Sequence, residues 1–181
     1  MEAKLFVTDY ASYNEGTQFE FGHWVELSDF SDADEFTDYL SNHFKQCDEK
    51  RPLGYGAIRE EWMFTDFEDF PKQLYSESMN VKDMERLFEF LELNDEEKAK
   101  ACYLLEQGED VDYAIANCED VFMYEYDGSS RAKWDLFELM YPEAEAMEQS
   151  NAYVSVDYDR FISDNYNEFE YDGVTYLVES N

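Results

Sequence analysis

Basic residues are scarce in this chain of 181 residues. It has 13 Lys and Arg against 45 Asp and Glu, which gives a formal net charge of −32 at pH 7. A surface with this balance repels nucleic acid and anionic membranes, so we expect neither as a partner. The surface also repels itself, which lowers stability and requires a compensating reason.

Cysteine and long apolar runs are also scarce. The three cysteines, Cys47, Cys102 and Cys118, form no CxxC pair, and no apolar run approaches the length of about 18 residues typical of a membrane helix. The N-terminal residues lack the apolar stretch of a secretion signal. We therefore expect a cytoplasmic protein with reduced thiols and no membrane anchor.

Motifs for catalysis and cofactor binding are missing. The chain has no GxGxxG, GxxxxGK[ST] or GxSxG sequence, and Gly54-Tyr55-Gly56 is too short to cradle a phosphate. His23 and His43 are too few for a histidine-rich metal site, and we interpret them as satisfied polar residues at a strand or helix end. We expect a protein that is not an enzyme and that holds no cofactor and no metal ion.

Calcium is the metal that a chain so rich in carboxylates could bind. An EF-hand loop requires acidic or amide residues at positions 1, 3 and 5 and a glycine at position 6. The pairs Asp32/Asp34 and Asp157/Asp159 are each followed by Phe at position 5, and neither has the glycine. A calcium- or cation-dependent acidic binding module therefore stays as an alternative function of this chain.

Aromatic residues, in contrast, are abundant. They make up 18% of the chain, and 44% of all residues are hydrophobic, which excludes intrinsic disorder. The charge is not confined to a tail, because residues 1–100 hold 25 acids and 10 bases and residues 101–181 hold 20 and 3. The negative charge therefore lies on a folded surface.

The first part of the chain predicts a β-β-α-β unit. Strands are expected at residues 5–10, 23–28 and 61–67. A polar turn at 14–16 lies in the connection between the first two strands. Ser31 is predicted to cap the helix that follows the second strand. Its buried face is expected to hold Ala33, Phe36, Leu40 and Phe44. Residues 47–59 contain Pro and two Gly and predict a loop.

The middle of the chain predicts helices. The first is capped by Asn80 and buries Val81, Met84, Leu87, Phe88 and Leu91; Arg86 and Glu89 are spaced for an ion pair. The second follows Asn94 and stops at Gly108, and a short third covers 111–117.

The remainder mixes strands and helices. The predicted elements are a strand within 119–127, a helix at 131–141, a strand at 153–156, a helix at 157–165 that buries Phe161, and a hairpin over 168–179 with an Asp-Gly turn. We predict an α+β fold, an elongated chain of three small modules. Two mixed units with small antiparallel sheets, at 1–76 and 118–181, flank a helical module at 77–117.

Residues 119–127 read EDVFMYEYD, a strand surrounded only by negative charge, with no Lys or Arg between Lys100 and Arg131. Phe122, Tyr124 and Tyr126 share one face of such a strand. They fit either the core or a subunit interface, where Tyr is enriched, and we favour the interface.

Three explanations of the charge compete: hydration in high salt, a basic protein partner, and imitation of nucleic acid. Duplex DNA carries one charge per about 1.7 Å of axis, so a net charge of −32 corresponds to about 54 Å of duplex. That length is within reach of an elongated protein of this size. The arithmetic permits mimicry of DNA.

Several blocks in fixed order resemble one known family. They are LFVTDYASYNEG, GHWVELSDFSDADEFTDYL, EEWMFTDFEDFP, LEQGEDVDYAIANCEDVFMYEYD, YVSVDYDRFISDN and EFEYDGVTYLVES. In this order and with this charge, the chain resembles the ArdA antirestriction family over nearly its whole length. It departs from the family pattern in TQFEF (17–21) and in the loop at 51–56.

The resemblance implies an acidic DNA mimic that occupies the DNA-binding groove of type I restriction-modification enzymes and protects incoming mobile DNA. It also implies a homodimer. From the acidic runs in this sequence we predict a partner-binding surface formed by Asp34, Asp38, Glu106, Glu109, Asp110, Asp112, Glu119, Asp120, Glu125 and Asp127. The predicted dimer-interface residues are Phe122, Tyr124 and Tyr126.

Overall fold

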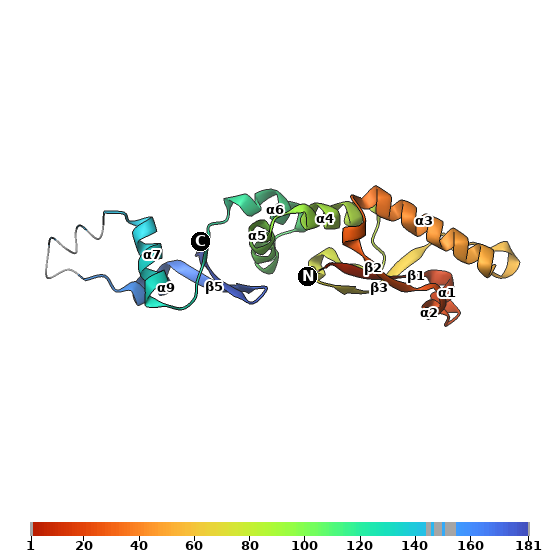
Figure 1. Ribbon diagram of the computed structural model, residues 1–181, viewed down its shortest axis with the longest axis horizontal. Coiled ribbons are helices and arrows are strands. Elements are labelled where there is room, and N and C mark those ends of the chain that lie inside the picture. The colour runs from red at the N-terminus through yellow and green to blue at the C-terminus, as the bar shows by residue number, and fades with distance from the viewer. Residues whose placement is uncertain (1, 144–145, 147–149, 151–154, 181) are drawn as a thin grey trace. The chain divides into compact units, whose positions relative to one another are not determined.

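The computed structural model describes residues 2–143, 146, 150 and 155–180. The chain separates into two compact units, one formed by Met1–Asn94 with Asp110–Ile115 and the other by Asp95–Glu109 with Ala116–Asn181. Each unit contains one three-stranded antiparallel sheet together with helices (Figure 1). The predicted α+β class is confirmed, and the division into three modules stays a prediction.

The sheet of the first unit has the order β2-β1-β3. Its strands are β1 (Lys4–Asp9), β2 (His23–Glu26) and β3 (Trp62–Glu68). The register places Phe6 opposite Trp24 on β2 and Asp66 on β3, and a bulge follows Phe6. The three predicted strands are thus confirmed, with small shifts at their ends.

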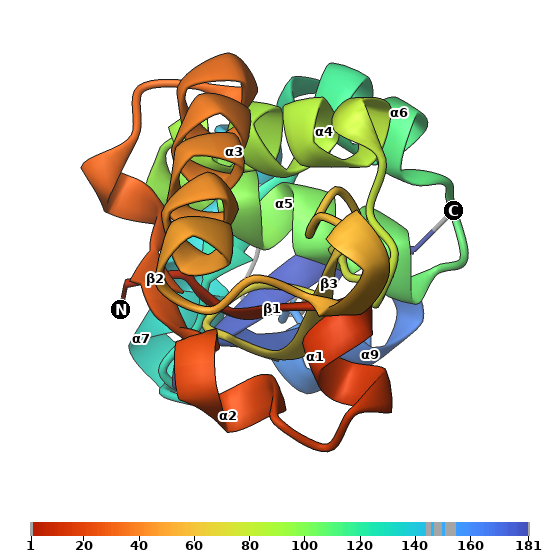
Figure 2. The same cartoon turned by 90° about the vertical axis from the view of Figure 1, so that its right-hand side faces the viewer.

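Helix α3 (Ala33–Lys50) lies on one side of this sheet, and α1 (Tyr10–Asn14) and α2 (Gln18–Phe21) lie toward the other (Figures 1 and 2). Alternate strand residues face α3, and the rings of Phe36 and Phe64 are 6.2 Å apart. The buried residues of this core include Leu5, Val7, Val25, Phe36, Leu40, Phe44 and Phe64. The predicted buried face of the helix is confirmed.

Local details of this unit differ from the sequence prediction. The N-cap of α3 is Asp32, whose Oδ1 accepts the Glu35 N–H at 2.8 Å, and the Ser31 hydroxyl instead donates to the Glu35 carboxylate at 2.8 Å. The helix continues to Lys50, so the loop begins later than predicted. The connection around the 14–16 turn forms α1 and α2.

Two further helices contribute to the first unit. Helix α4 (Val81–Glu92) begins with a capping box in which Asn80 accepts the Asp83 N–H and Asp83 accepts the Asn80 N–H. Helix α6 (Val111–Asn117) begins after Asp110, as predicted. The predicted buried face of α4 is partly wrong, because Val81 is 50% exposed and Phe90 is buried.

Arg59 is buried among three segments of the first unit. Its guanidinium donates to Asp48 on α3 at 2.6 Å and to the Arg51 carbonyl at 2.9 Å, and its Nε lies 3.5 Å from Asp9. Asp9 is fully buried at the end of β1. The cation lies 5.0 Å from the ring centroid of Phe21. One basic residue therefore holds β1, α2 and the end of α3 together.

Both histidines belong to the first unit, and both contact the Phe21 carbonyl. His23 Nδ1 lies 3.1 Å from that oxygen and His43 Nε2 lies 3.0 Å from it. A carbonyl only accepts, so both nitrogens donate, and His23 Nε2 is left to accept from the Tyr39 hydroxyl at 2.5 Å. His23 is satisfied at a strand end, as predicted, whereas His43 lies within α3.

The second unit contains α5 (Asp95–Glu106), α7 (Ser130–Met140) and α9 (Tyr158–Asn165). Its sheet has the order β4-β6-β5, with β4 (Met123–Glu125), β5 (Tyr166–Tyr171) and β6 (Val174–Glu179). The predicted helices are confirmed. So is the hairpin, where Asp172 and Gly173 both have positive φ, as an Asp-Gly turn requires.

The strand predicted within 119–127 is shorter than expected. Residues 118–120 form a 3-10 turn, and only Met123–Glu125 pair as a strand with β6. The pairing extends by one bond, from the Tyr126 N–H to the Thr175 carbonyl. The strand predicted at 153–156 lies partly outside the described residues, and its last two positions have no regular structure.

A small core holds the second unit. Its buried members are Leu136, Ile162, Tyr166 and Leu177. Phe161, predicted to be core, is half-buried and packs against this cluster, with its ring 5.5 Å from that of Tyr166. On α5, Tyr103 contacts Phe169 at 5.5 Å between ring centroids. All three cysteines are free and buried, and burial raises the pKa of the Cys102 thiol to about 12.

The buried Arg59 leads to a stability prediction. We expect Arg59→Ala to lower the free energy of unfolding by about 3–5 kcal/mol, because Asp9 would stay buried without its counter-charge. Urea unfolding followed by circular dichroism measures the loss. The control is Arg160→Ala, which removes an exposed pair with Asp164 at 3.1 Å and should change stability little. Equal effects of the two substitutions would contradict this account.

His43 leads to a prediction about pH. Burial lowers the pKa of His43 below its ordinary value of 6.5, and the neighbouring His23 acts in the same direction. The unfolded chain then binds this proton more readily, so the contribution of His43 to stability is present above pH 6.5 and is lost as the pH falls through its lowered folded pKa. We expect His43→Gln, which keeps a donor but does not titrate, to flatten the pH dependence of the unfolding free energy just below pH 6.5. An unchanged pH dependence would exclude this role.

Candidate partner-binding surface

All ten carboxylates predicted to form the partner-binding surface are exposed. Four belong to the first unit, namely Asp34 and Asp38 on α3 and Asp110 and Asp112 at α6. Six belong to the second unit: Glu106, Glu109, Glu119, Asp120, Glu125 and Asp127. The two units carry equal charge, because the first holds 24 acids and 8 bases and the second holds 21 and 5.

Asp112 differs from the others because its charge is compensated within the first unit. The Arg86 guanidinium contacts it at 2.5 Å, and the Lys82 ammonium lies 3.5 Å away. The hydrogen bond from Arg86 holds the pKa of Asp112 below its ordinary value. Arg86 also lies 3.6 Å from Asp83, so its predicted pairing with Glu89 is wrong. Asp112 therefore offers a partner less free negative charge than its neighbours.

Two further members also serve the local fold. The Asp110 carboxylate accepts the Tyr113 N–H at 2.9 Å and so begins α6, and the Asp127 carboxylate accepts the Ser129 N–H at 2.8 Å. Hydrogen bonds from Ser129 lower the pKa of Asp127. Each side chain still exposes its charge, so both can contribute to a negative surface.

The carboxylates near α5 lie where they do not stabilise their own helix. Glu106 ends α5, and the last turn of this helix holds no basic residue. A negative charge at a helix C-terminus is unfavourable, because the backbone carbonyls there already carry partial negative charge. Gly108, with φ of +92°, then turns the chain toward Glu109. Stability of the helix does not explain these acids.

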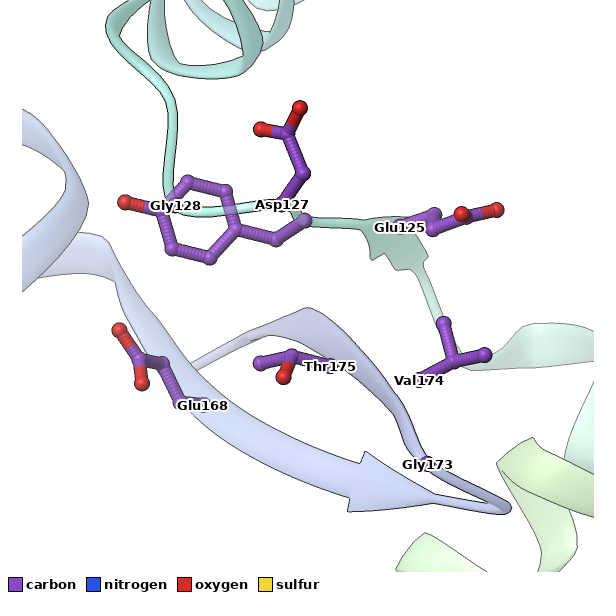
Figure 3. Close-up of a pocket in the computed structure, with 8 residues that line it drawn as sticks. Glu125, Asp127, Gly128, Glu168, Gly173, Val174 and Thr175 are labelled. Atoms are coloured by element: carbon purple, nitrogen blue, oxygen red, sulfur yellow. The ribbon is translucent and has the colours of Figure 1, made fainter.

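An open hollow of about 490 Å³ brings Glu125 and Asp127 together with Glu168 of β5. Its other lining residues are Tyr126, Gly128, Gly173, Val174 and Thr175. The lining contains no basic residue. Figure 3 shows the three carboxylates pointing apart rather than converging on one point. The described residues likewise include no group of three or more side chains able to hold a metal ion. The negative charge of the hollow is therefore distributed over its lining and is not concentrated at one point.

The comparison with known families decides the identity of the chain. The model of the antirestriction protein family ArdA matches residues 5–178. The chain belongs to the ArdA family. Membership implies an antirestriction function with a restriction enzyme as the partner. No curated protein matches the chain. In the described part of this ArdA protein, every helix is too short or too polar to cross a membrane.

In this ArdA protein, Glu168 is the acid of the hollow that the sequence prediction did not include. It lies in the acidic run Glu168-Phe169-Glu170 of β5, a pattern that indicates an exposed strand edge but no particular neighbour. Its proximity to Glu125 depends on the sheet order β4-β6-β5. That order could not be predicted from local residue patterns.

Phe122, Tyr124 and Tyr126 are half-buried and pack against the core of the second unit. The ring of Phe122 lies 6.3 Å from that of Tyr166. Burial raises the pKa of the Tyr124 hydroxyl. These aromatics hold β4 on its unit, and their remaining exposure leaves the predicted dimer contact as a hypothesis.

Proposed function

We propose that this ArdA protein inhibits type I restriction-modification enzymes by occupying their DNA-binding groove in place of DNA. The observation that supports the proposal is the exposure of all ten predicted carboxylates on two folded units of equal negative charge. A groove that binds DNA presents Lys and Arg to phosphates. Folded carboxylates offer those bases the same sign of charge.

The distribution of ion pairs supports this function. Glu125 makes no ion pair among the described residues, and the charged residues that line the hollow around it are all acids. Such a surface costs stability in the free protein, and a cationic partner relieves the repulsion. Binding releases counterions from both partners, so the affinity should fall steeply as salt rises.

We further propose that the protein forms a homodimer through β4. This strand is at the edge of its sheet, where a second chain can pair with free backbone groups. Phe122 and Tyr126 flank that edge and are half-buried within their own unit. Their remaining exposed surface is the apolar part of the proposed contact.

The first functional prediction concerns the six proposed acids of the second unit. Reversing all six to Lys should abolish inhibition of a purified type I enzyme, because the groove would then meet like charge. Each single neutralisation should weaken inhibition less than about fivefold, as expected for an exposed charge. DNA cleavage assays at several protein concentrations give the inhibition constants. For the wild-type protein, the apparent inhibition constant should rise with added DNA if the protein and DNA compete for the groove.

A matched variant controls for net charge. It reverses six exposed acids of the first unit outside the proposed surface: Glu15, Glu49, Glu60, Glu85, Glu89 and Glu92. We expect this control variant to retain more inhibition than the variant with the six second-unit acids reversed. Full inhibition by that second-unit variant, or wild-type inhibition that is insensitive to DNA concentration, would overturn the mimicry mechanism.

The second functional prediction concerns the dimer. We expect Phe122→Ala and Tyr126→Ala to shift the protein toward monomer in analytical sedimentation. Because both side chains also pack on their own core, circular dichroism must show that each variant is folded. Phe161→Ala is the matched control, since it trims the same core but belongs to α9 and not to the β4 segment. Folded variants with unchanged mass would refute the proposed interface.

A further inference from the structure

Three aromatic rings form a cluster on the sheet face of the first unit that points away from α3. Phe6 of β1 contacts Trp24 of β2 at 5.6 Å between ring centroids, edge to face. Phe19 of α2 contacts Phe6 at 5.9 Å. Both contacts have the geometry that aromatic pairs favour. The cluster is thus preformed, and its three members come from three different elements.

The cluster is unusually exposed for its composition. Phe19 is 76% exposed and Trp24 is 40% exposed. Alternate residues of the same strands, such as Leu5, Val7 and Val25, are buried against α3. The core of the unit therefore does not require Phe19 or Trp24, and large aromatics exposed together mark a contact surface.

Charged residues surround the cluster on the same face. Asp66 lies opposite Phe6 on β3. Lys4 precedes Phe6 by two residues on β1, so it lies on the same face, opposite Glu26 and Glu68. Lys4 contacts Glu26 at 3.2 Å, and this hydrogen bond raises its pKa. Three acids against one base leave the rim negative. The face combines an apolar centre with a rim that attracts cations.

We propose that this face binds an arginine-bearing surface of a cationic protein partner. A guanidinium can stack on Trp24 or Phe19 and at the same time pair with Asp66, which a lysine ammonium does less well. A second copy of this chain is a poor occupant, because it would bring another unit with 24 acids and 8 bases. The partner's identity as a restriction enzyme rests on the proposed function, whereas the chemistry of the face does not.

The contact would add a part of the binding energy that salt does not screen. Carboxylates bind through charge, and their contribution falls with ionic strength. Stacking on Trp24 and Phe19 also buries apolar area, and this part of the contact is not weakened by ionic screening. The aromatic cluster would therefore maintain binding at salt concentrations where the acidic surface alone becomes weak.

The test uses the full-length double variant Phe19→Ser/Trp24→Thr, which keeps every charge. Its probes are decamers of arginine and of lysine, with binding measured by calorimetry at two salt concentrations. We expect the wild type to bind the arginine peptide several-fold more tightly than the lysine peptide. The double variant should lose about tenfold in affinity for the arginine peptide at both salts, and its preference should disappear.

The control variant is Ile58→Ser, which removes another exposed apolar side chain of the same unit, 58% exposed, and should leave the preference unchanged. Equal wild-type affinity for the two peptides, or a preference that survives in the double variant, would overturn the proposal. A shift of the double variant from dimer to monomer would also overturn it, by identifying a second copy as the occupant.

A separate assay distinguishes this proposal from the mimicry mechanism. With a purified type I enzyme, the double variant should inhibit about tenfold more weakly than the wild type, with an unchanged dependence on salt. A wild type that does not compete with DNA but prefers the arginine peptide would refute mimicry alone. Competition by the wild type together with equal inhibition by the double variant would refute the aromatic contact alone.

Discussion

Repulsion between like charges is the constraint on which the rest of this structure depends. With 45 acids in 181 residues, acidic side chains cannot avoid one another, and each pair of close exposed neighbours costs about 0.2–0.5 kcal/mol. Burying one Phe or Leu contributes about 1.5–3 kcal/mol, so a few buried rings offset many such pairs. Phe36, Phe44 and Phe64 are fully buried in the first unit. The high aromatic content therefore offsets the repulsion that the high negative charge causes.

Several of the few bases join neighbouring elements. Arg59 joins β1 to the end of α3, and Arg86 joins α4 to α6 through Asp112. Lys133 of α7 likewise contacts Asp159 of α9. Each of these bases neutralises an acid that the fold needs nearby. Between Lys100 and Arg131, in contrast, the sequence contains no base, and Glu125 has none in the hollow that it lines.

Features set by neighbouring residues were predictable from the sequence, and features set by distant ones were not. The Asn80 cap and the Asp172-Gly173 hairpin depend on residues within one turn, and both were predicted correctly. Ser31 and Asp32 can each cap a helix, and the choice depends on Glu35 reaching back to Ser31. The burial of Arg59 and the proximity of Glu168 to Glu125 follow from tertiary contacts, which leave no local pattern. The exposure of the surface acids followed from their number alone.

The stretch at 119–127 shows how one segment can serve both the fold and the surface. Its aromatics hold a short edge strand on the core of the second unit, while Glu125 and Asp127 line the hollow beside it. Because the strand is anchored by apolar contacts rather than by ion pairs, its acids need no local counter-charge to stay in place. A cationic groove can then supply the missing positive charge without breaking any contact inside the protein. In the proposed function, an acidic surface fixed by aromatic packing has to gain little order on binding.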